Sequence, residues 1–200
     1  DDQCKKLIND AINHYGQVDV LVNNAGISDA VNPAAEADIA LFRQVVDVNL
    51  NACFLLSALA ARDMLERGTG SIINIASVHG LVASAPNLQP AYAASKAGLI
   101  GLTNSLQFEA RKLKLDINCN VLIPQADTRM TQDFTSSVNE RRISQGKPAS
   151  RSAPPEVMQR LSPDKVSAMV VWLAHPSCDA QASIHEAGGG YFAQLNWARS

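Results

Sequence analysis

The chain has 200 residues, of which 46% are apolar and 18% are charged, and its formal net charge is −2. This length and composition predict one soluble domain with enough chain to bury a substantial core. The near balance of 17 basic and 19 acidic residues gives no reason to expect a nucleic acid or an anionic membrane as a partner. We also expect no apolar run long enough to span a bilayer.

Neither the cysteines nor the histidines are spaced like a metal site. The four cysteines lie far apart and mostly in apolar segments, so neither a disulfide framework nor a Cys-x-x-Cys motif is predicted. The four histidines show no metal-ligand spacing either. We therefore expect a reduced, intracellular environment and no bound metal.

Helices and strands alternate along the chain, judged by apolar residues at a period of 3.6 and by continuous β-branched runs. The predicted elements, in chain order, are a helix at 1–16, a strand at 18–22, a helix at 36–67, a strand at 71–76, a helix at 91–113, a strand at 117–123, a helix at 162–174 and a strand at 182–187. Strands that are continuous apolar runs predict a doubly wound α/β fold, with a parallel sheet covered on both faces.

Residues 131–161 are rich in Ser, Pro, Arg and Gln and have few large apolar side chains. No hydrophobic period holds through them, so we expect a long, mobile loop with some helix. Such a loop is uncommon in a compact domain unless it has a function.

Three of the predicted strands end in residues with special chemistry. Asn23-Asn-Ala-Gly26 follows the first, Ser77 follows the second, and Pro124-Gln-Ala-Asp-Thr128 ends the third. In a parallel sheet the carboxyl ends of the strands meet at one rim, where ligands bind. We expect the functional site there, beside the start of the helix at 91–113.

Tyr92 and Lys96 lie one turn apart at the start of that helix, with side-chain origins roughly 5–6 Å apart. At about 4 Å and an effective dielectric near 20, an ammonium interacts with a phenolate by about 4 kcal/mol. That energy would pull the pKa of the phenol from about 10 towards 7. Tyr92 would then exchange protons at neutral pH. An ordinary half-buried helix face has the same spacing.

These motifs together, in this order and at these distances, resemble the short-chain dehydrogenase/reductase family over nearly the whole chain. The resemblance implies a Rossmann-like fold and hydride transfer between NAD or NADP and a hydroxyl or carbonyl group. Tyr92 would be the general acid/base, Lys96 would lower its pKa and hold the nicotinamide ribose, and Ser77 would hydrogen-bond the substrate oxygen. Asn49 matches a helical Asn that supports a water-linked proton relay. The residues implied to line the cofactor are Asn24, Ala25, Gly26, Tyr92, Lys96, Pro124, Ala126 and Thr128.

Two features depart from the family pattern. Ser77 lies 15 residues before Tyr92, a longer spacing than is usual, so the intervening loop must bulge. The glycine-rich turn that holds a pyrophosphate is also missing, together with the first strands of the fold and the residue that selects NAD or NADP. We therefore expect residues 1–200 to be a single, N-terminally truncated domain of this family.

The C-terminal half is most similar to the (3R)-hydroxyacyl-CoA dehydrogenase domains of peroxisomal multifunctional enzymes. The likeness rests on Gln125 after Pro124, on the segment 128–132, and on the stretches that end at Cys178 and Trp197. It implies a 3-hydroxyacyl thioester substrate, a role in fatty acid metabolism and a preference for NAD. An acyl-carrier-protein reductase or a steroid reductase of the same family stays open. Arg141, Arg142, Lys147 and Arg151 either meet the phosphates of CoA or form a solvated basic loop.

Two functions from different classes remain. The first is an oxidoreductase acting on a small molecule, as a homodimer or homotetramer, in the cytoplasm or in peroxisomes. The second is a truncated, cofactor-free family member that acts only through subunit association, because the family pairs the long helices, here about 40–66 and 92–113, across a dimer. The sequence ends in Ala-Arg-Ser, without a Ser-Lys-Leu-type peroxisomal signal.

Overall fold

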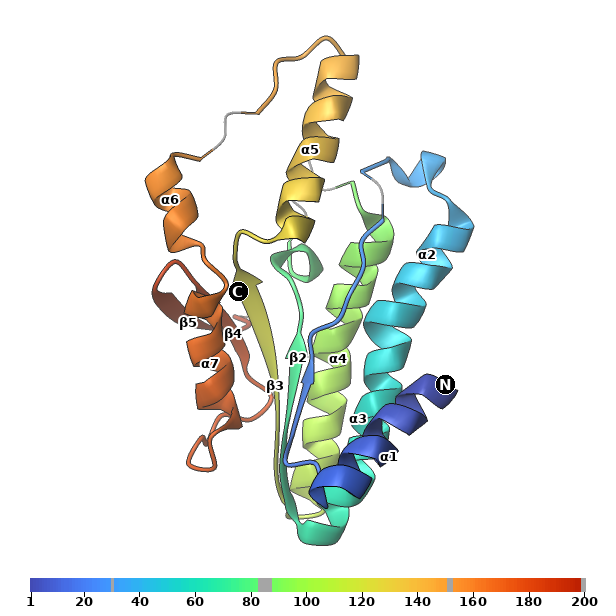
Figure 1. Ribbon diagram of the computed structural model, residues 1–200, viewed down its shortest axis with the longest axis vertical. Coiled ribbons are helices and arrows are strands. Elements are labelled where there is room, and N and C mark those ends of the chain that lie inside the picture. The colour runs from blue at the N-terminus through green and yellow to red at the C-terminus, as the bar shows by residue number, and fades with distance from the viewer. Residues whose placement is uncertain (30, 83–87, 151–152, 199–200) are drawn as a thin grey trace.

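The computed structural model describes residues 1–29, 31–82, 88–150 and 153–198, and a five-stranded sheet lies at its centre (Figure 1). The strands lie side by side in sequence order: β1 (Val20–Asn23), β2 (Thr69–Ile75), β3 (Asp116–Gln125), β4 (Ile184–Gly188) and β5 (Tyr191–Leu195). The first four pair in parallel, and β5 is antiparallel to β4. The predicted α/β fold with a parallel sheet is confirmed.

Helices cover both faces of the sheet, with α1 to α4 along one face and α7 against the other (Figure 1). The α-helices are α1 (Asp2–Tyr15), α2 (Ile39–Val46), α3 (Ala52–Arg67), α4 (Pro90–Lys112), α5 (Arg129–Ser144), α6 (Pro155–Arg160) and α7 (Asp164–Ala174). Short 3-10 turns occur at η1 (Ala34–Glu36) and η3 (Val78–Gly80), and a π-helical turn, η2, at Asp47–Asn51.

The alternation of side chains along β3 divides the core into two layers. Cys119 packs with residues of α1, α3 and α4, and Val121 and Ile123 pack with Ile100 of α4. Leu122 points to the other face, where it belongs to the cluster that α7 forms with β2 and β4. This period of two is what a sheet buried on both faces requires.

The register brings the strand ends to one rim. Asn23 at the end of β1 pairs with Asn74, and Ile75 at the end of β2 pairs with Leu122 of β3. The segments that follow β1, β2 and β3 therefore leave the sheet on the same side. This is the rim at which the sequence places the site.

The long helix expected at 36–67 is helical from Ile39 to Arg67, but η2 interrupts its α-helical geometry. This stretch of 29 residues is long and apolar enough to cross a membrane by length and composition, so the expectation that no apolar run reaches that length is wrong. Its buried residues recur at helical spacing, so one face of the helix packs on the core, although only 17% of its most apolar window is buried. They are Val45, Asn49, Cys53, Ser57, Ala60 and Met64.

The segment 131–161, expected to be a loop with some helix, is largely helical in α5 and α6. The prediction relied on the absence of an apolar period, and α5 does bury a single residue, Val138. Local chemistry supports the helix instead, because the Thr128 side chain accepts a hydrogen bond from Thr131 N and caps its first turn. The helix stands above the rim of the sheet (Figure 1).

Strand β5 is an element that the sequence analysis misses. Gly189 and Gly190 have φ values of 60° and 88° and connect β4 to β5 as a two-residue turn. Two glycines between apolar runs are a hairpin signal, because only such residues adopt positive φ without strain.

The predicted helix from Asp1 to Gly16 is confirmed, with Gly16 as a left-handed cap.

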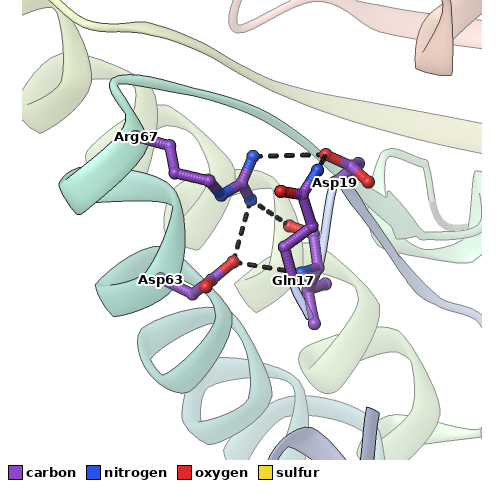
Figure 2. A network of polar contacts seen from close by, with 5 residues as sticks. Gln17, Asp19, Asp63 and Arg67 are labelled. Atoms are coloured by element: carbon purple, nitrogen blue, oxygen red, sulfur yellow. Dashed lines mark hydrogen bonds and ion pairs between the residues drawn. The ribbon is translucent and has the colours of Figure 1, made fainter. Parts of the chain in front are cut away.

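A polar network fixes the start of β1 to the end of α3 (Figure 2). Arg67 Nη2 donates to Val18 O at 2.7 Å and to Asp63 Oδ2 at 2.8 Å, and Arg67 Nη1 reaches Asp19 Oδ1 at 3.2 Å. Asp63 Oδ2 also accepts a hydrogen bond from Val18 N at 3.0 Å. These hydrogen bonds hold the pKa of Asp63 below its usual value, and the one from Val18 N–H has a larger effect than the one from Arg67.

We expect Asp63→Asn to lower the free energy of unfolding at pH 7 by about 1–2 kcal/mol, since a charge-assisted pair is lost. Folding lowers the pKa of Asp63, so its contribution is complete above the ordinary value of 3.8 and is lost as the pH falls through the folded value. Urea unfolding at several pH values should show the difference narrowing in acid. Asp19→Asn, at a more exposed carboxylate, is the control and should change stability less.

Candidate active site

The candidate catalytic residues come from separate elements and meet at the carboxyl rim. Ser77 follows β2, Tyr92 and Lys96 lie in the first two turns of α4, and Asn49 lies in η2. Gly26, in the segment after β1, packs between two of them. A Cβ atom at Gly26 would lie 3.2 Å from Asn49 Oδ1 and 3.6 Å from Lys96 Nζ.

Lys96 is buried, and its ammonium group donates a hydrogen bond of 2.7 Å to Ile75 O at the end of β2. Nζ lies 5.6 Å from the centroid of the Tyr92 ring, over its face. Burial disfavours the charged form and lowers the pKa of Lys96 to about 8. The two side chains that the helical spacing predicts to be neighbours are neighbours in the structure.

The pKa of Tyr92 shifts in the direction opposite to the predicted one. Burial raises it above the ordinary value of 10, and a hydrogen bond with the Ser77 side chain offsets only part of that rise. The charge of Lys96 favours a phenolate, but desolvation of the phenol on burial is the larger effect here. At neutral pH Tyr92 therefore holds its proton and can donate it.

Ser77 lies beside Tyr92, close enough for its hydroxyl to lower the pKa of the phenol. Its Oγ also accepts a hydrogen bond from His79 N at 3.2 Å, which caps η3. The bulge expected in the long Ser77–Tyr92 connection falls partly on residues 83–87, which lie outside the described residues.

Gly80 lets η3 approach α4 more closely than another residue would. A Cβ atom there would come within 2.7 Å of the backbone of Lys96 and Ala97. Backbone atoms cannot move aside as a flexible side chain can. The missing side chain at Gly80 therefore sets the distance between the turn that carries Ser77 and the helix that carries Tyr92.

Asn49 holds the segment after β1 against α4. Its Oδ1 accepts a hydrogen bond from Ile27 N at 2.9 Å, and its Nδ2 donates to Ile27 O at 2.8 Å and to Ser95 Oγ at 3.1 Å. Ser95 Oγ in turn donates to Tyr92 O at 2.8 Å. The side chain is therefore occupied in positioning the rim, and a part in a proton relay stays a prediction.

Asp29 is a site residue that the sequence analysis misses. Its carboxylate accepts hydrogen bonds from Ala91 N at 3.0 Å and from Tyr92 N at 3.1 Å, so it caps the N-terminus of α4. Local cap signals could not reveal it, because the residue before α4 is Gln89, which makes no side-chain cap. Asp29 thus fixes the first turn of the helix on which Tyr92 lies.

The residues predicted to line a cofactor lie along the same rim. Asn24 and Ala25 are exposed, and Gly26 is half-buried beside Lys96. Pro124, Ala126 and Thr128 are half-buried at and after the end of β3. Within the described ranges, no group of three or more His, Cys, Asp or Glu side chains could hold a metal ion.

Two basic residues of the segment after β3, Arg141 and Arg142, have partners within the chain. Arg141 Nη1 donates to Asn32 Oδ1 at 3.1 Å and pairs with Glu36 at 3.5 Å. Arg142 Nε donates to Pro148 O at 2.8 Å. Arg141 thus ties α5 to the segment that follows β1, beside a cavity of about 410 Å³. Arg151 lies outside the described residues.

Comparison with known proteins gives one family and several relatives. The family model described as short chain dehydrogenase matches residues 1–139. The peroxisomal hydratase-dehydrogenase-epimerase of Saccharomyces cerevisiae is 37% identical over 196 residues, which are 98% of this chain and 19% of that protein. The 3beta-hydroxysteroid dehydrogenase 2 of Eggerthella lenta is 38% identical over 124 residues, 62% of this chain and 46% of that protein.

Among solved structures, full-length peroxisomal multifunctional enzyme type 2 from Drosophila melanogaster aligns with a TM-score of 0.72 and 27% identity. The alignment covers 90% of this chain and 28% of that one. This chain therefore spans between about a fifth and a half of the length of the relatives named here.

We expect Gly80→Ala to lower the free energy of unfolding by about 1–3 kcal/mol, because its Cβ would overlap the backbone of α4. Gly101→Ala is the matched control within α4. No atom lies within 4 Å of its added Cβ, so alanine should stabilise this helical position by up to about 1 kcal/mol. Thermal unfolding of the two variants should give shifts of opposite sign, and equal shifts would contradict the close approach at Gly80.

Proposed function

This chain belongs to the short-chain dehydrogenase family, and we propose that it transfers a hydride between a nicotinamide cofactor and a 3-hydroxyacyl or 3-ketoacyl thioester. The observation that carries the proposal is the buried Lys96 over the face of Tyr92, with the Ser77 hydroxyl close enough to the phenol to lower its pKa. A phenol between a hydroxyl and an ammonium can hold a substrate oxygen and exchange a proton with it.

The reacting oxygen lies between Ser77 and Tyr92 in this mechanism. In alcohol oxidation the phenolate of Tyr92 takes the hydroxyl proton, and Ser77 hydrogen-bonds the oxygen as it becomes a carbonyl. In the reverse direction the phenol donates its proton to the developing alkoxide. Asp29 fixes the start of α4, and Gly80 fixes the turn after β2 against that helix. Together they set the position of Tyr92 relative to Ser77.

The rim has the donors that a nicotinamide ribose needs. An ammonium group has three hydrogen-bond donors, and among the described residues Lys96 gives one of them to Ile75 O. The remaining donors can bind the ribose hydroxyls, with Gly26 leaving room beside Nζ. NAD or NADP would supply the hydride acceptor or donor, and the resemblance noted in the sequence favours NAD.

The raised pKa of Tyr92 determines how the rates of reduction and oxidation should depend on pH. At neutral pH the phenol is protonated and suits the reduction of a carbonyl. Oxidation needs the phenolate, so its rate should rise with pH towards the pKa of Tyr92. If Lys96 had lowered that pKa to neutrality, the rate would instead level off above about pH 7.

The thioester is supported by the relatives that cover almost the whole chain, which are named as peroxisomal hydratase-dehydrogenase-epimerase and peroxisomal multifunctional enzyme type 2. Their names also support a peroxisomal location. A steroid is the second candidate substrate, favoured by a relative that is 38% identical but covers only 62% of this chain. Assaying both substrate classes side by side decides between them.

Subunit association is the competing function, for which exposed apolar surface gives some support. Val20 and Val22 are exposed on the edge strand β1, and Phe54 and Phe108 are exposed on α3 and α4. We propose that the two long helices pair across a homodimer, in either function. Titration with NADH separates the functions, because saturable binding supports the enzyme and no binding favours association alone.

Tyr92→Phe should abolish turnover of a 3-hydroxyacyl thioester in the intact protein, because the proton acceptor is lost. Cofactor binding, followed by fluorescence on titration with NADH, should stay nearly unchanged, since the ring over Lys96 remains. Tyr15→Phe, at an exposed tyrosine on α1, is the control and should retain full activity. Full activity of Tyr92→Phe would contradict the assignment.

Phe108→Glu should shift the protein towards the monomer, because Phe108 is 70% exposed on α4 and its replacement would carry a charge into the dimer interface. The mass in solution can be measured by light scattering after gel filtration. Tyr15→Glu is the control, at a side chain that is 77% exposed on α1. A monomeric mass for the unaltered protein, or an unchanged dimer for the Phe108→Glu variant, would place no interface on α4.

A further inference from the structure

His79 is held at the rim of the site by its own turn. It lies in the middle of η3, where its N–H donates to Ser77 Oγ, and the following Gly80 packs against the backbone of α4. Its position relative to Ser77 and Tyr92 is therefore fixed by backbone contacts.

The imidazole lies between the candidate acid/base and α5. Its ring centroid is 5.8 Å from that of Tyr92 at an interplanar angle of 83°, and 5.5 Å from that of Phe134 at 60°. Both are edge-to-face contacts, which restrict the rotation of the ring. The rings of Tyr92 and Phe134 thus hold the imidazole next to the candidate acid/base.

One nitrogen of this ring has no partner. Nδ1 of His79 is buried, and no described residue forms a hydrogen bond with it. A buried polar atom without a partner is costly and uncommon in folded proteins. Burial also lowers the pKa of His79, so the ring is neutral near pH 7 and has one donor and one acceptor nitrogen.

A second histidine shares these properties but lies in another environment. His185 also has a buried nitrogen without a partner among the described residues, and burial lowers its pKa. Its ring contacts Trp172 of α7, on the face of the sheet opposite α4. The proximity to Tyr92 and Ser77 therefore distinguishes His79.

We propose that His79 contacts the substrate, donating a hydrogen bond to the carbonyl oxygen of the thioester while Tyr92 and Ser77 hold the oxygen at the 3-position. This inference rests on the proposed function. A 3-hydroxyacyl thioester has two oxygens separated by three carbon atoms, and a group adjacent to Tyr92 can meet the second one. A neutral donor suits an uncharged thioester, whereas a free carboxylate would favour a charged imidazole.

The experiment compares two alcohols that differ in the second oxygen. The probes are the N-acetylcysteamine thioester of 3-hydroxybutyrate and 2-butanol, which lacks the carbonyl, each assayed with the intact protein and NAD or NADP. His79→Phe keeps the ring contacts and removes both nitrogens. We expect kcat/KM for the thioester to fall about tenfold to a hundredfold, and for 2-butanol to change less than about twofold.

His79→Gln restores a hydrogen-bond donor and should recover part of the loss for the thioester. Affinity for the N-acetylcysteamine thioester of 3-ketobutyrate, measured by calorimetry, gives a readout independent of turnover and should weaken in His79→Phe alone. An equal fall for both alcohols, or none for the thioester, would show that His79 does not contact the carbonyl.

The free acid provides the remaining test. Free 3-hydroxybutyrate should be a poor substrate. The assignment would be overturned if the free acid had a higher kcat/KM than the thioester, and if that kcat/KM increased as His79 became protonated. If the unaltered protein oxidises none of these probes, the proposed function fails and the role of His79 fails with it. Full thioester turnover by His79→Phe would instead contradict His79 and leave the proposed function standing.

Discussion

The burial of the Lys96 ammonium group is the constraint on which the rim of this sheet depends. Removing a charge from water is costly, and the lowering of its pKa to about 8 reflects that cost. The hydrogen bond to Ile75 O offsets part of it and ties α4 to the end of β2. Gly26 lies next to both Nζ and the Asn49 side chain, so the segments after two strands are arranged around one side chain.

Polar groups also connect the interior of the sheet to α4. Asn23 Nδ2 donates to Asn74 Oδ1 at 2.8 Å, and Asn74 Nδ2 donates to Thr103 Oγ1 at 2.9 Å. All three residues are buried. Together with the Asp29 cap and the Asn49–Ser95 hydrogen bond, they fix α4 along its length, so that its first turn has one position relative to the strand ends. Precise placement of Tyr92 is what proton transfer requires.

The elements that repeat a local pattern could be predicted from the sequence, and the others could not. The strands ending at Asn23 and Gln125 and the helix carrying Tyr92 follow from the period of their apolar residues. Helix α5 lacks an apolar period because it buries little more than Val138. The π-helical turn around Asn49 lies inside a continuous helical stretch, where such turns usually occur, so the helical period does not reveal it.

The sequence by itself determined the order of the strand ends and the one-turn spacing of Tyr92 and Lys96, because both depend only on local periodicity. The tertiary structure alone decided that burial raises the pKa of Tyr92, that Asp29 caps α4 from more than 60 residues away, and that His79 lies between Tyr92 and Phe134. Desolvation and long-range contacts arise only when distant segments pack together, so no spacing within the chain could reveal them.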